Sequence, residues 1–283
     1  MNITKTNGRP TLSGIWQTYR LKITGTMSLL MVERVLGVAV PFVLGVAIND
    51  LIAGNFRGVW WLIALEVIVL SVGTVRRLYD TRVYAGIYTD IADNTAQRLD
   101  LDVSRRAARL GLARELVDFF EWELPQLVAA LISITGAMGM LVYLMPTIGG
   151  LSFVVGLVVA VIFVISRGRM FSLNKLLNNE LERQVTMIEG EREFSRRRHL
   201  SRLARWRIHL SDLEATNFAI AEIFLSALII GAVVLTVHAG LSVGEVFAIL
   251  TYLLGVAESL IILPWTYQQS IRAREIGGRM ATS

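Results

Sequence analysis

The residues of this sequence that could take part in chemistry such as proton transfer are ionisable side chains inside long apolar stretches. Glu66 is the most isolated of them, because the segment from Leu62 to Leu70 around it is otherwise apolar. A carboxyl group in such surroundings favours its protonated form, since a low-dielectric medium disfavours charge. Two interpretations of Glu66 are open: reversible protonation as part of a proton-coupled process, and a protonated, hydrogen-bonded structural role.

A second set of charged residues lies at a common depth in the apolar stretches. We measure depth from the end of each stretch that is farther from the basic loops, with about 1.5 Å of rise per residue. On this measure Glu66 lies roughly 10 Å deep, and the second set lies roughly 24 to 30 Å deep. This predicted inner layer consists of Glu33, Arg34, Arg76, Arg77, Glu222 and Glu258. The layer is either the gate of a cavity or a set of ion pairs and snorkelling side chains at the membrane interface.

The sequence contains no motif for catalysis or metal binding. It has no cysteine, which excludes disulfides and thiolate ligands. His199, His209 and His238 fall in three separate segments, and no pair has the spacing of metal ligands. None of the lysines ends a glycine-rich phosphate-binding loop. We therefore expect no enzyme activity of its own, no cofactor and no metal.

An acidic run from Glu115 to Glu123 is the remaining candidate for ligand binding. Glu115, Asp118, Glu121 and Glu123 have a helical spacing that could ligate a cation. The neighbouring aromatic residues place this run at the membrane surface, where a solvated acidic face is the favoured interpretation.

Six apolar stretches must position these residues. The chain has 283 residues, of which 54% are hydrophobic and 18% are charged, a balance typical of membrane proteins. A helix that crosses the hydrocarbon layer needs about 20 apolar residues. The sequence predicts a single all-α transmembrane domain over residues 1–283, with spans at about 23–48, 59–75, 124–143, 148–165, 220–237 and 243–263.

The distribution of basic residues predicts the orientation of these spans. Of the 28 lysines and arginines, 26 lie before the first span, in the second and fourth connections, or after the last span. This asymmetry follows the positive-inside rule and predicts that both termini are cytoplasmic. The net charge of +5 is therefore expected to face anionic lipid, and no nucleic-acid partner is expected.

The two long internal connections are predicted to be helical. They lack clusters of Gly, Pro and Ser, and apolar residues recur every three or four positions. Leu173, Leu177, Leu181, Val185 and Ile188 show this spacing after the fourth span. Residues 10–22 are predicted to form an elbow helix in the interface, because their apolar residues share one helical face next to basic ones.

The chain resembles the exporter-type transmembrane domain of ABC transporters. The likeness rests on the elbow helix, on a first span that carries Pro41 and ends in Ile48-Asn49-Asp50, on short external loops and on long helical internal hairpins. It also rests on the last external turn, Leu241-Ser-Val-Gly-Glu245, and on the helix after it, which continues through Phe247, Tyr252 and Leu253 to Pro264.

The resemblance implies a dimer, either of this chain or with a paralogous half, around a cavity that opens alternately to each side of a bacterial inner (plasma) membrane. The sequence departs from the family in two ways. It contains no nucleotide-binding domain, and its internal hairpins are short, with Gly111 and Asp118 closer together than the family pattern. Bacterial peptide-uptake proteins that use this fold without an ATPase and run on the proton gradient are the nearest analogy.

Three functions are therefore open. The leading one is a transporter subunit that moves a solute by alternating access without its own ATPase, for which an ion or proton gradient is one of two competing energy sources. The second is the transmembrane subunit of an ABC transporter whose ATPase is a separate chain. The third is a membrane assembly or regulatory protein of the same fold that does not transport.

Overall fold

The described chain is helical throughout. The computed structural model describes residues 12–97, 103–182 and 193–260, and these contain no β-strand. The helices are α1 (Leu12–Ile52), α2 (Arg57–Ala96), α3 (Val103–Asp118), the π-helix η1 (Phe119–Glu123), α4 (Leu124–Leu144), α5 (Pro146–Glu182), α7 (Glu193–His238) and a last helix, Val243–Leu260. The all-α prediction is confirmed.

Six helices are long and apolar enough to cross a membrane. They run well beyond the predicted spans: α2 has 40 residues, α5 has 37 and α7 has 46. The predicted helical extensions of spans two, four and five are therefore present in the described residues. The most apolar segments of these helices are only 11% to 39% buried within the chain, so most of their apolar surface faces lipid or another protein.

The structure divides into two compact units. The first contains residues 1–146 and 235–283, and the second contains residues 147–234. The division falls near the start of α5 and near the end of α7.

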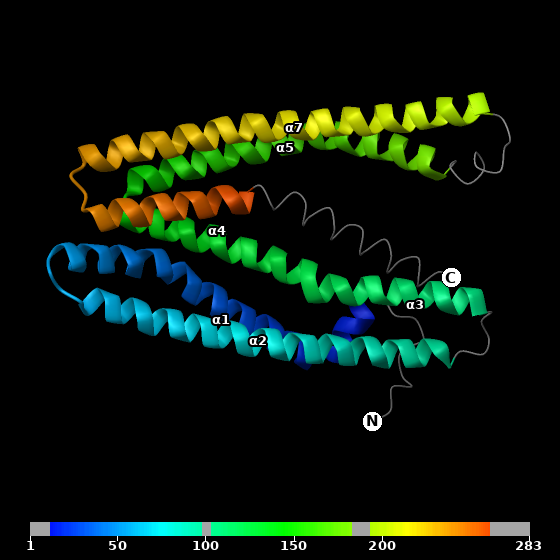
Figure 1. Cartoon of the computed structure of the whole chain (residues 1–283), viewed down its shortest axis with the longest axis horizontal. Coiled ribbons are helices and arrows are strands. Elements are labelled where there is room, and N and C mark those ends of the chain that lie inside the picture. Colours follow the sequence, from blue (N-terminus) through cyan, green and yellow to red (C-terminus); the bar gives the residue numbers. More distant parts are fainter. Residues whose placement is uncertain (1–11, 98–102, 183–192, 261–283) are drawn as a thin grey trace. The chain divides into compact units, whose positions relative to one another are not determined.

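In the first unit, α1 and α2 lie side by side and antiparallel (Figure 1). The turn between them places Gly54 at a φ of +77°, a conformation that glycine adopts without steric cost. Gly58 lies in the first turn of α2, and its backbone N–H donates to Asp50 Oδ2 over 2.7 Å. A Cβ on Gly58 would lie 2.7 Å from Ala47 Cα, so α1 and α2 touch through backbone next to this turn.

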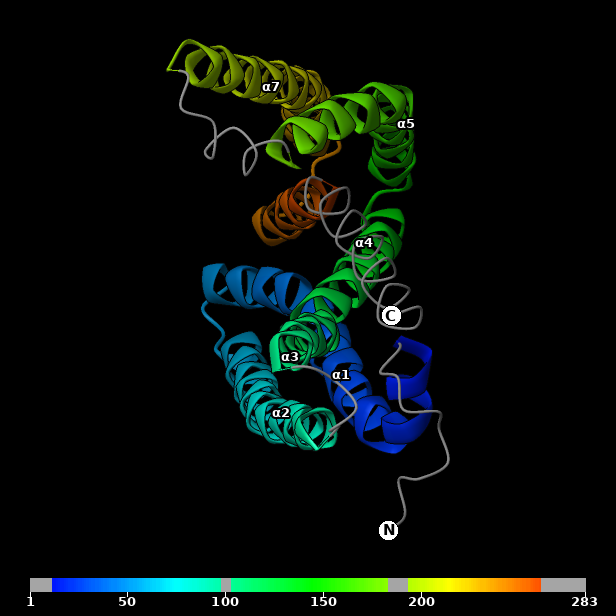
Figure 2. The same cartoon turned by 90° about the vertical axis from the view of Figure 1, so that its right-hand side faces the viewer.

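The hydrophobic core of the first unit lies at the opposite end of this helix pair. There the start of α1 and the second half of α2 pack against α3 and η1. The buried residues are Ile15, Ile23, Val83, Tyr84, Ile87, Ile91, Ala113, Leu116, Val117 and Phe120. Tyr19 breaks the helical geometry of α1, with φ −110° and ψ 18°, and this bend near the start of α1 is visible in Figure 2. The break lies within the range predicted for the elbow, residues 10–22, of which 10 and 11 are outside the described residues.

The helices α3, η1 and α4 follow one another without a loop (Figure 1). The π-helical turn η1 carries Phe120, which is buried in the core, and Glu121, whose side chain is 16% exposed. A π-helical turn widens the backbone and rotates the residues after it relative to those before it, and such turns are frequent at functional sites.

The last helix is held against the C-terminal end of α1 by polar groups and by glycine. Asn49 donates from Nδ2 to Ser242 Oγ over 2.8 Å and accepts the Gly244 backbone N–H at Oδ1 over 2.8 Å. Ser242 and Glu245 form a capping box, in which Glu245 Oε2 accepts the Ser242 backbone N–H over 2.8 Å. A Cβ on either Gly45 or Gly244 would collide with the backbone carbonyl of the other.

Two further contacts continue this packing along α1. Tyr252 of the last helix donates its hydroxyl to the Val38 carbonyl over 2.6 Å. Gly136 of α4 lies against the Val38 side chain, since a Cβ there would be 2.6 Å from Val38 Cγ2. The middle of α1, which carries Pro41, is therefore in contact with both α4 and the last helix.

In the second unit, α5 and α7 lie side by side and antiparallel (Figure 1). Ser166 donates to Asn217 Oδ1 over 2.8 Å in the apolar part of the pair. Farther along, buried His199 of α7 and buried Glu180 of α5 make an Nδ1 to Oε1 contact of 2.8 Å. Arg202 Nε lies 3.2 Å from the same oxygen of Glu180, so this carboxylate has two basic partners.

Candidate functional site

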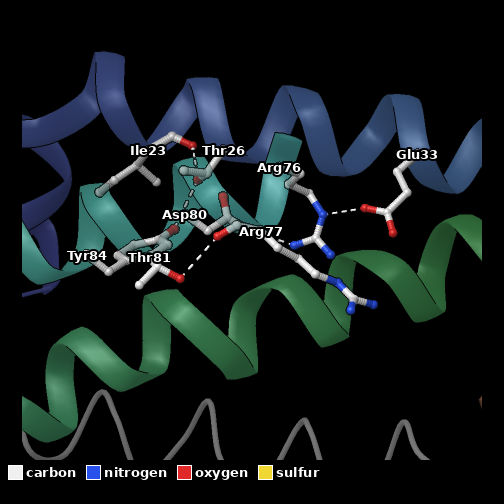
Figure 3. Close-up of polar contacts among 8 residues, drawn as sticks. All are labelled: Ile23, Thr26, Glu33, Arg76, Arg77, Asp80, Thr81 and Tyr84. Atoms are coloured by element: carbon white, nitrogen blue, oxygen red, sulfur yellow. Dashed lines mark hydrogen bonds and ion pairs between the residues drawn. The ribbon is translucent and has the colours of Figure 1, made fainter. Parts of the chain in front are cut away.

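Three charged side chains meet between α1 and α2: one lies inside the predicted first span, and two follow the end of the predicted second span. Arg76 donates from Nε to Glu33 Oε2 and from Nη1 to Asp80 Oδ2, the latter over 2.7 Å. The side chains of Glu33, Arg76 and Asp80 are only 12% to 13% exposed. Figure 3 shows Arg76 between the two carboxylates. We call these three residues the Glu33–Arg76–Asp80 cluster.

Helix geometry explains how the cluster forms. Arg76 and Asp80 are four residues apart on α2, so they lie one turn apart on the same face. Gly73, one turn before Arg76, leaves room for Glu33 of α1: a Cβ there would be 3.1 Å from Glu33 Oε1. The glycine therefore allows the charged side chain of α1 to reach α2.

A second pair of polar groups lies one turn beyond Asp80. Thr26 donates its hydroxyl to the Ile23 carbonyl over 2.8 Å. Because a threonine hydroxyl carries one hydrogen, Tyr84 must be the donor in its 3.0 Å contact with Thr26 Oγ1. The Tyr84 hydrogen is therefore directed to Thr26 and is not available to Asp80 (Figure 3).

Asp80 is the member of the cluster that has a buried side-chain oxygen without a hydrogen bond in the described part of the chain. It is 9% exposed, and its Oδ1 is buried without a hydrogen-bond partner among the described residues. Its only ion-pair partner in that part of the chain is Arg76, which is shared with Glu33. A buried oxygen in this position needs a partner or a proton.

A family model described as ABC transporter transmembrane region matches residues 12–244. The chain belongs to this family. The match runs from the start of α1 to the beginning of the last helix and includes the whole cluster. The comparison with curated proteins found no match.

As a member of the ABC transporter transmembrane region family with six apolar helices, the chain is an integral membrane protein. The predicted resemblance is confirmed by the family match. Any ionised group among its apolar segments therefore has to be balanced by a partner, by a proton or by access to water.

In this transmembrane region, the structure joins only part of the predicted inner layer. It pairs Glu33 with Arg76, as the common depth of the two residues suggested. Arg34, Arg77 and Glu258 are in the same unit but are exposed. Glu222 belongs to the second unit and is also exposed.

The sequence reasoning missed Asp80, because it searched the apolar stretches and the second of these ends at Val75. A signal was nevertheless present. An acidic residue four positions after an arginine on a helix is a standard ion-pair spacing, and Asp80 stands in this relation to Arg76.

Glu66, the predicted proton-coupling residue of this ABC transporter transmembrane region, lies on an exposed face of α2. Ile63 is 46% exposed on this face and Val67 is 57% exposed, so the surroundings of Glu66 are apolar. It makes no hydrogen bond or ion pair with the residues that the structure describes.

The acidic run near η1 is built around one arginine. Arg114 Nε lies 2.9 Å from Asp118 Oδ1, and its Nη2 lies 3.8 Å from Glu121 Oε2. Arg114 also stacks over the ring of Tyr88, with 5.2 Å from Cζ to the ring centroid. The described residues contain no group of three or more His, Cys, Asp or Glu side chains arranged to hold a metal ion.

Proposed function

We propose that this chain is a transporter subunit that moves a solute by alternating access and is coupled to protons. The family match supports the transport role. The Glu33–Arg76–Asp80 cluster is the observation that supports proton coupling, because it places a buried carboxylate oxygen without a hydrogen-bond partner among the described residues between two helices of the apolar bundle. In this proposal the energy comes from the proton gradient and no ATPase resides on this chain.

A separately encoded ATPase subunit is the alternative energy source. The family to which the chain belongs supports it, as do the long helical extensions of α2, α5 and α7 beyond the predicted spans. Such extensions give a peripheral subunit a place to dock. A role in membrane assembly without transport is the third possibility, and it would be left if neither energy source drove uptake.

We propose a dimer, formed from two copies or with a paralogous half, in the inner membrane of a bacterium with both termini in the cytoplasm. Large apolar side chains are exposed along the spans of the isolated chain, among them Val35 of α1 and Leu70 of α2. A cavity that must exclude lipid requires a second set of helices to cover such faces. The distribution of basic residues supports the orientation.

The dimer leads to a direct expectation about mass. Native mass measurement in mild detergent should give twice the mass of the 283-residue chain for two copies, or the summed mass of the chain and the paralogous half purified with it. The controls are reconstitution and uptake with material from the same preparation. A preparation that is wholly monomeric and still transports after reconstitution would refute the dimer.

Uptake into proteoliposomes tests the proposed function itself. With an imposed pH gradient, the reconstituted protein should accumulate at least one compound from a small panel of peptides and amphiphilic cations, and a protonophore should abolish this accumulation. Liposomes without protein are the control. Uptake that ignores the pH gradient but needs ATP and an added ATPase subunit would instead support the alternative.

A further inference from the structure

The Glu33–Arg76–Asp80 cluster contains more negative than positive charge. Two carboxylates face a single guanidinium, and all three side chains are nearly buried. Were every group ionised, one negative charge would be left over. An unbalanced buried charge is costly enough that a group in such a position normally takes up a proton or binds a counter-ion.

The other charged residues packed around the cluster do not supply the missing positive charge. On α1 and α2, Arg34 and Arg77 are exposed. From the side of α3 and η1, Glu121 is close enough to be affected by the negative charge of Asp80, so the nearby group on that side is a further carboxylate. Arg114 on that side is already shared between Asp118 and Glu121.

The remaining helices of the first unit add no cation either. The segment of α4 from Leu124 to Leu144 contains no charged residue, and the described part of the last helix contributes only carboxylates, Glu245 and Glu258. Within the described chain, these helices therefore supply no positive charge that would balance the cluster.

We infer that the cluster is a proton-binding site and that Asp80 carries the proton on Oδ1. The other carboxylate oxygen of Asp80 accepts a hydrogen bond from Arg76, whereas Oδ1 is buried without a partner in the described residues. Glu33 already receives the Arg76 Nε–H, and its remaining oxygen is not among the fully buried unpartnered atoms. One proton on Asp80 brings the cluster to neutrality, and its release restores the excess charge.

Binding and release at this site need no other chemistry. Protonation forms one O–H bond on Oδ1, and deprotonation returns the proton to water without any electron transfer. The inference that the cluster binds a proton depends only on the charges and contacts of its three residues. The inference that this proton drives transport rests on the proposed function.

Infrared spectroscopy of the purified dimer, or of the protein in lipid, tests the site without any transport assay. At neutral pH the wild-type protein should show the carbonyl band of a protonated carboxyl group, and raising the pH should remove it. The band should shift when the protein is labelled with aspartate carrying ¹³C in the side-chain carboxyl group, which assigns it to an aspartic acid.

Three variants make the assignment specific. Asp80→Asn should lose the band. Glu33→Gln should also lose it at neutral pH even though Asp80 is still present, because one carboxylate is then balanced by one guanidinium. Asp93→Asn makes the same change on an exposed carboxylate of α2 and should keep the band.

Every other result overturns the inference. A band that survives in Asp80→Asn and disappears in Glu66→Gln would place the proton on Glu66. The absence of any band in the wild-type protein, combined with stabilisation by sodium ions, would make the cluster a cation site. Melting temperatures of the variants distinguish loss of the proton from loss of the fold. Glu33→Gln keeps the Asp80 side chain, so loss of the band in this variant tests separately whether the charge balance of the cluster causes protonation.

Discussion

Asp80→Asn should abolish proton-driven accumulation of substrate by the reconstituted protein while leaving exchange intact. The amide keeps the size of the acid but cannot bind and release a proton, so the step that couples the gradient to uptake is lost. Exchange of labelled for unlabelled substrate requires alternating access and no net proton movement. The variant should therefore resemble a permanently protonated protein.

The size of this effect follows from the energy of the gradient. One pH unit supplies about 1.4 kcal/mol per proton, which corresponds to about tenfold accumulation of a neutral substrate. Asp80→Asn should remove this factor and bring the internal concentration down to the external one. The measurement is the ratio of internal to external substrate at steady state, compared with Asp93→Asn as the matched control.

Glu66→Gln is the decisive comparison, because the sequence points to Glu66 as the proton carrier. If Glu66→Gln keeps the wild-type dependence on the pH gradient while Asp80→Asn loses it, coupling belongs to the buried cluster. If the pattern is reversed, coupling belongs to the exposed apolar face of α2. Loss in both variants would mean that the proton passes two sites in series.

The sequence predicted the helices of this protein well, because apolar length is a local property. The stretch from 148 to 165 has no charged residue, and the structure places it inside a single helix that starts at Pro146. Depth along a helix is also local, since each residue adds a constant rise. For that reason the sequence could place Glu33 and Arg76 at one level, where the structure joins them.

Direction around the helix axis was much harder to predict. Arg34 and Arg77 have the same predicted depth as their neighbours Glu33 and Arg76, but the structure shows them exposed. Each successive residue of a helix is rotated by about 100°, so adjacent residues at one depth face different surroundings. A sequence without known partners for each helix face cannot decide which of two neighbours points to the contact.

Neither the π-helical turn η1 nor the contact between the last helix and α1 could be predicted from a pattern in the sequence. Phe119–Glu123 looks like any helical segment, because one extra residue in a turn leaves no mark in composition. Asn49 and Ser242 are 193 positions apart, and their hydrogen bond follows from tertiary packing. In the sequence, the segments around Asn49 and Ser242 were recognised only as separate features of the family resemblance.

Gly244→Ala should strongly destabilise the first unit, because this residue lies where two helix backbones meet. A Cβ on Gly244 would overlap the Gly45 carbonyl group and would lie 2.8 Å from Asn49 Cγ. Backbone atoms cannot rotate away as a side chain can, so the last helix must shift from α1. Overpacking of this kind costs about 1 to 3 kcal/mol or more, and the Asn49 hydrogen bonds to Ser242 and Gly244 should be lost with it.

The same substitution elsewhere in that helix is the matched control. Gly255 also lies in the last helix, but a Cβ there meets nothing within 4 Å in the described part of the chain. Gly255→Ala should therefore leave the melting temperature unchanged or raise it, since alanine favours the helix by about 1 kcal/mol over glycine. Opposite signs for the two variants would separate a clash between backbones from a general effect of adding a methyl group.

Cross-linking shows whether the C-terminal end of α1 and the start of the last helix separate in Gly244→Ala. The chain has no cysteine, so Asn49→Cys with Ser242→Cys creates a single reactive pair where the native side chains are 2.8 Å apart. In the otherwise native protein this pair should oxidise quickly to a disulfide, since the side chains already face each other at close range. With Gly244→Ala added, oxidation should slow markedly because the helices are held apart. Equal rates together with an unchanged melting temperature would show that α1 and the last helix accommodate the methyl group, and that the glycine contact is not what holds the two helices together.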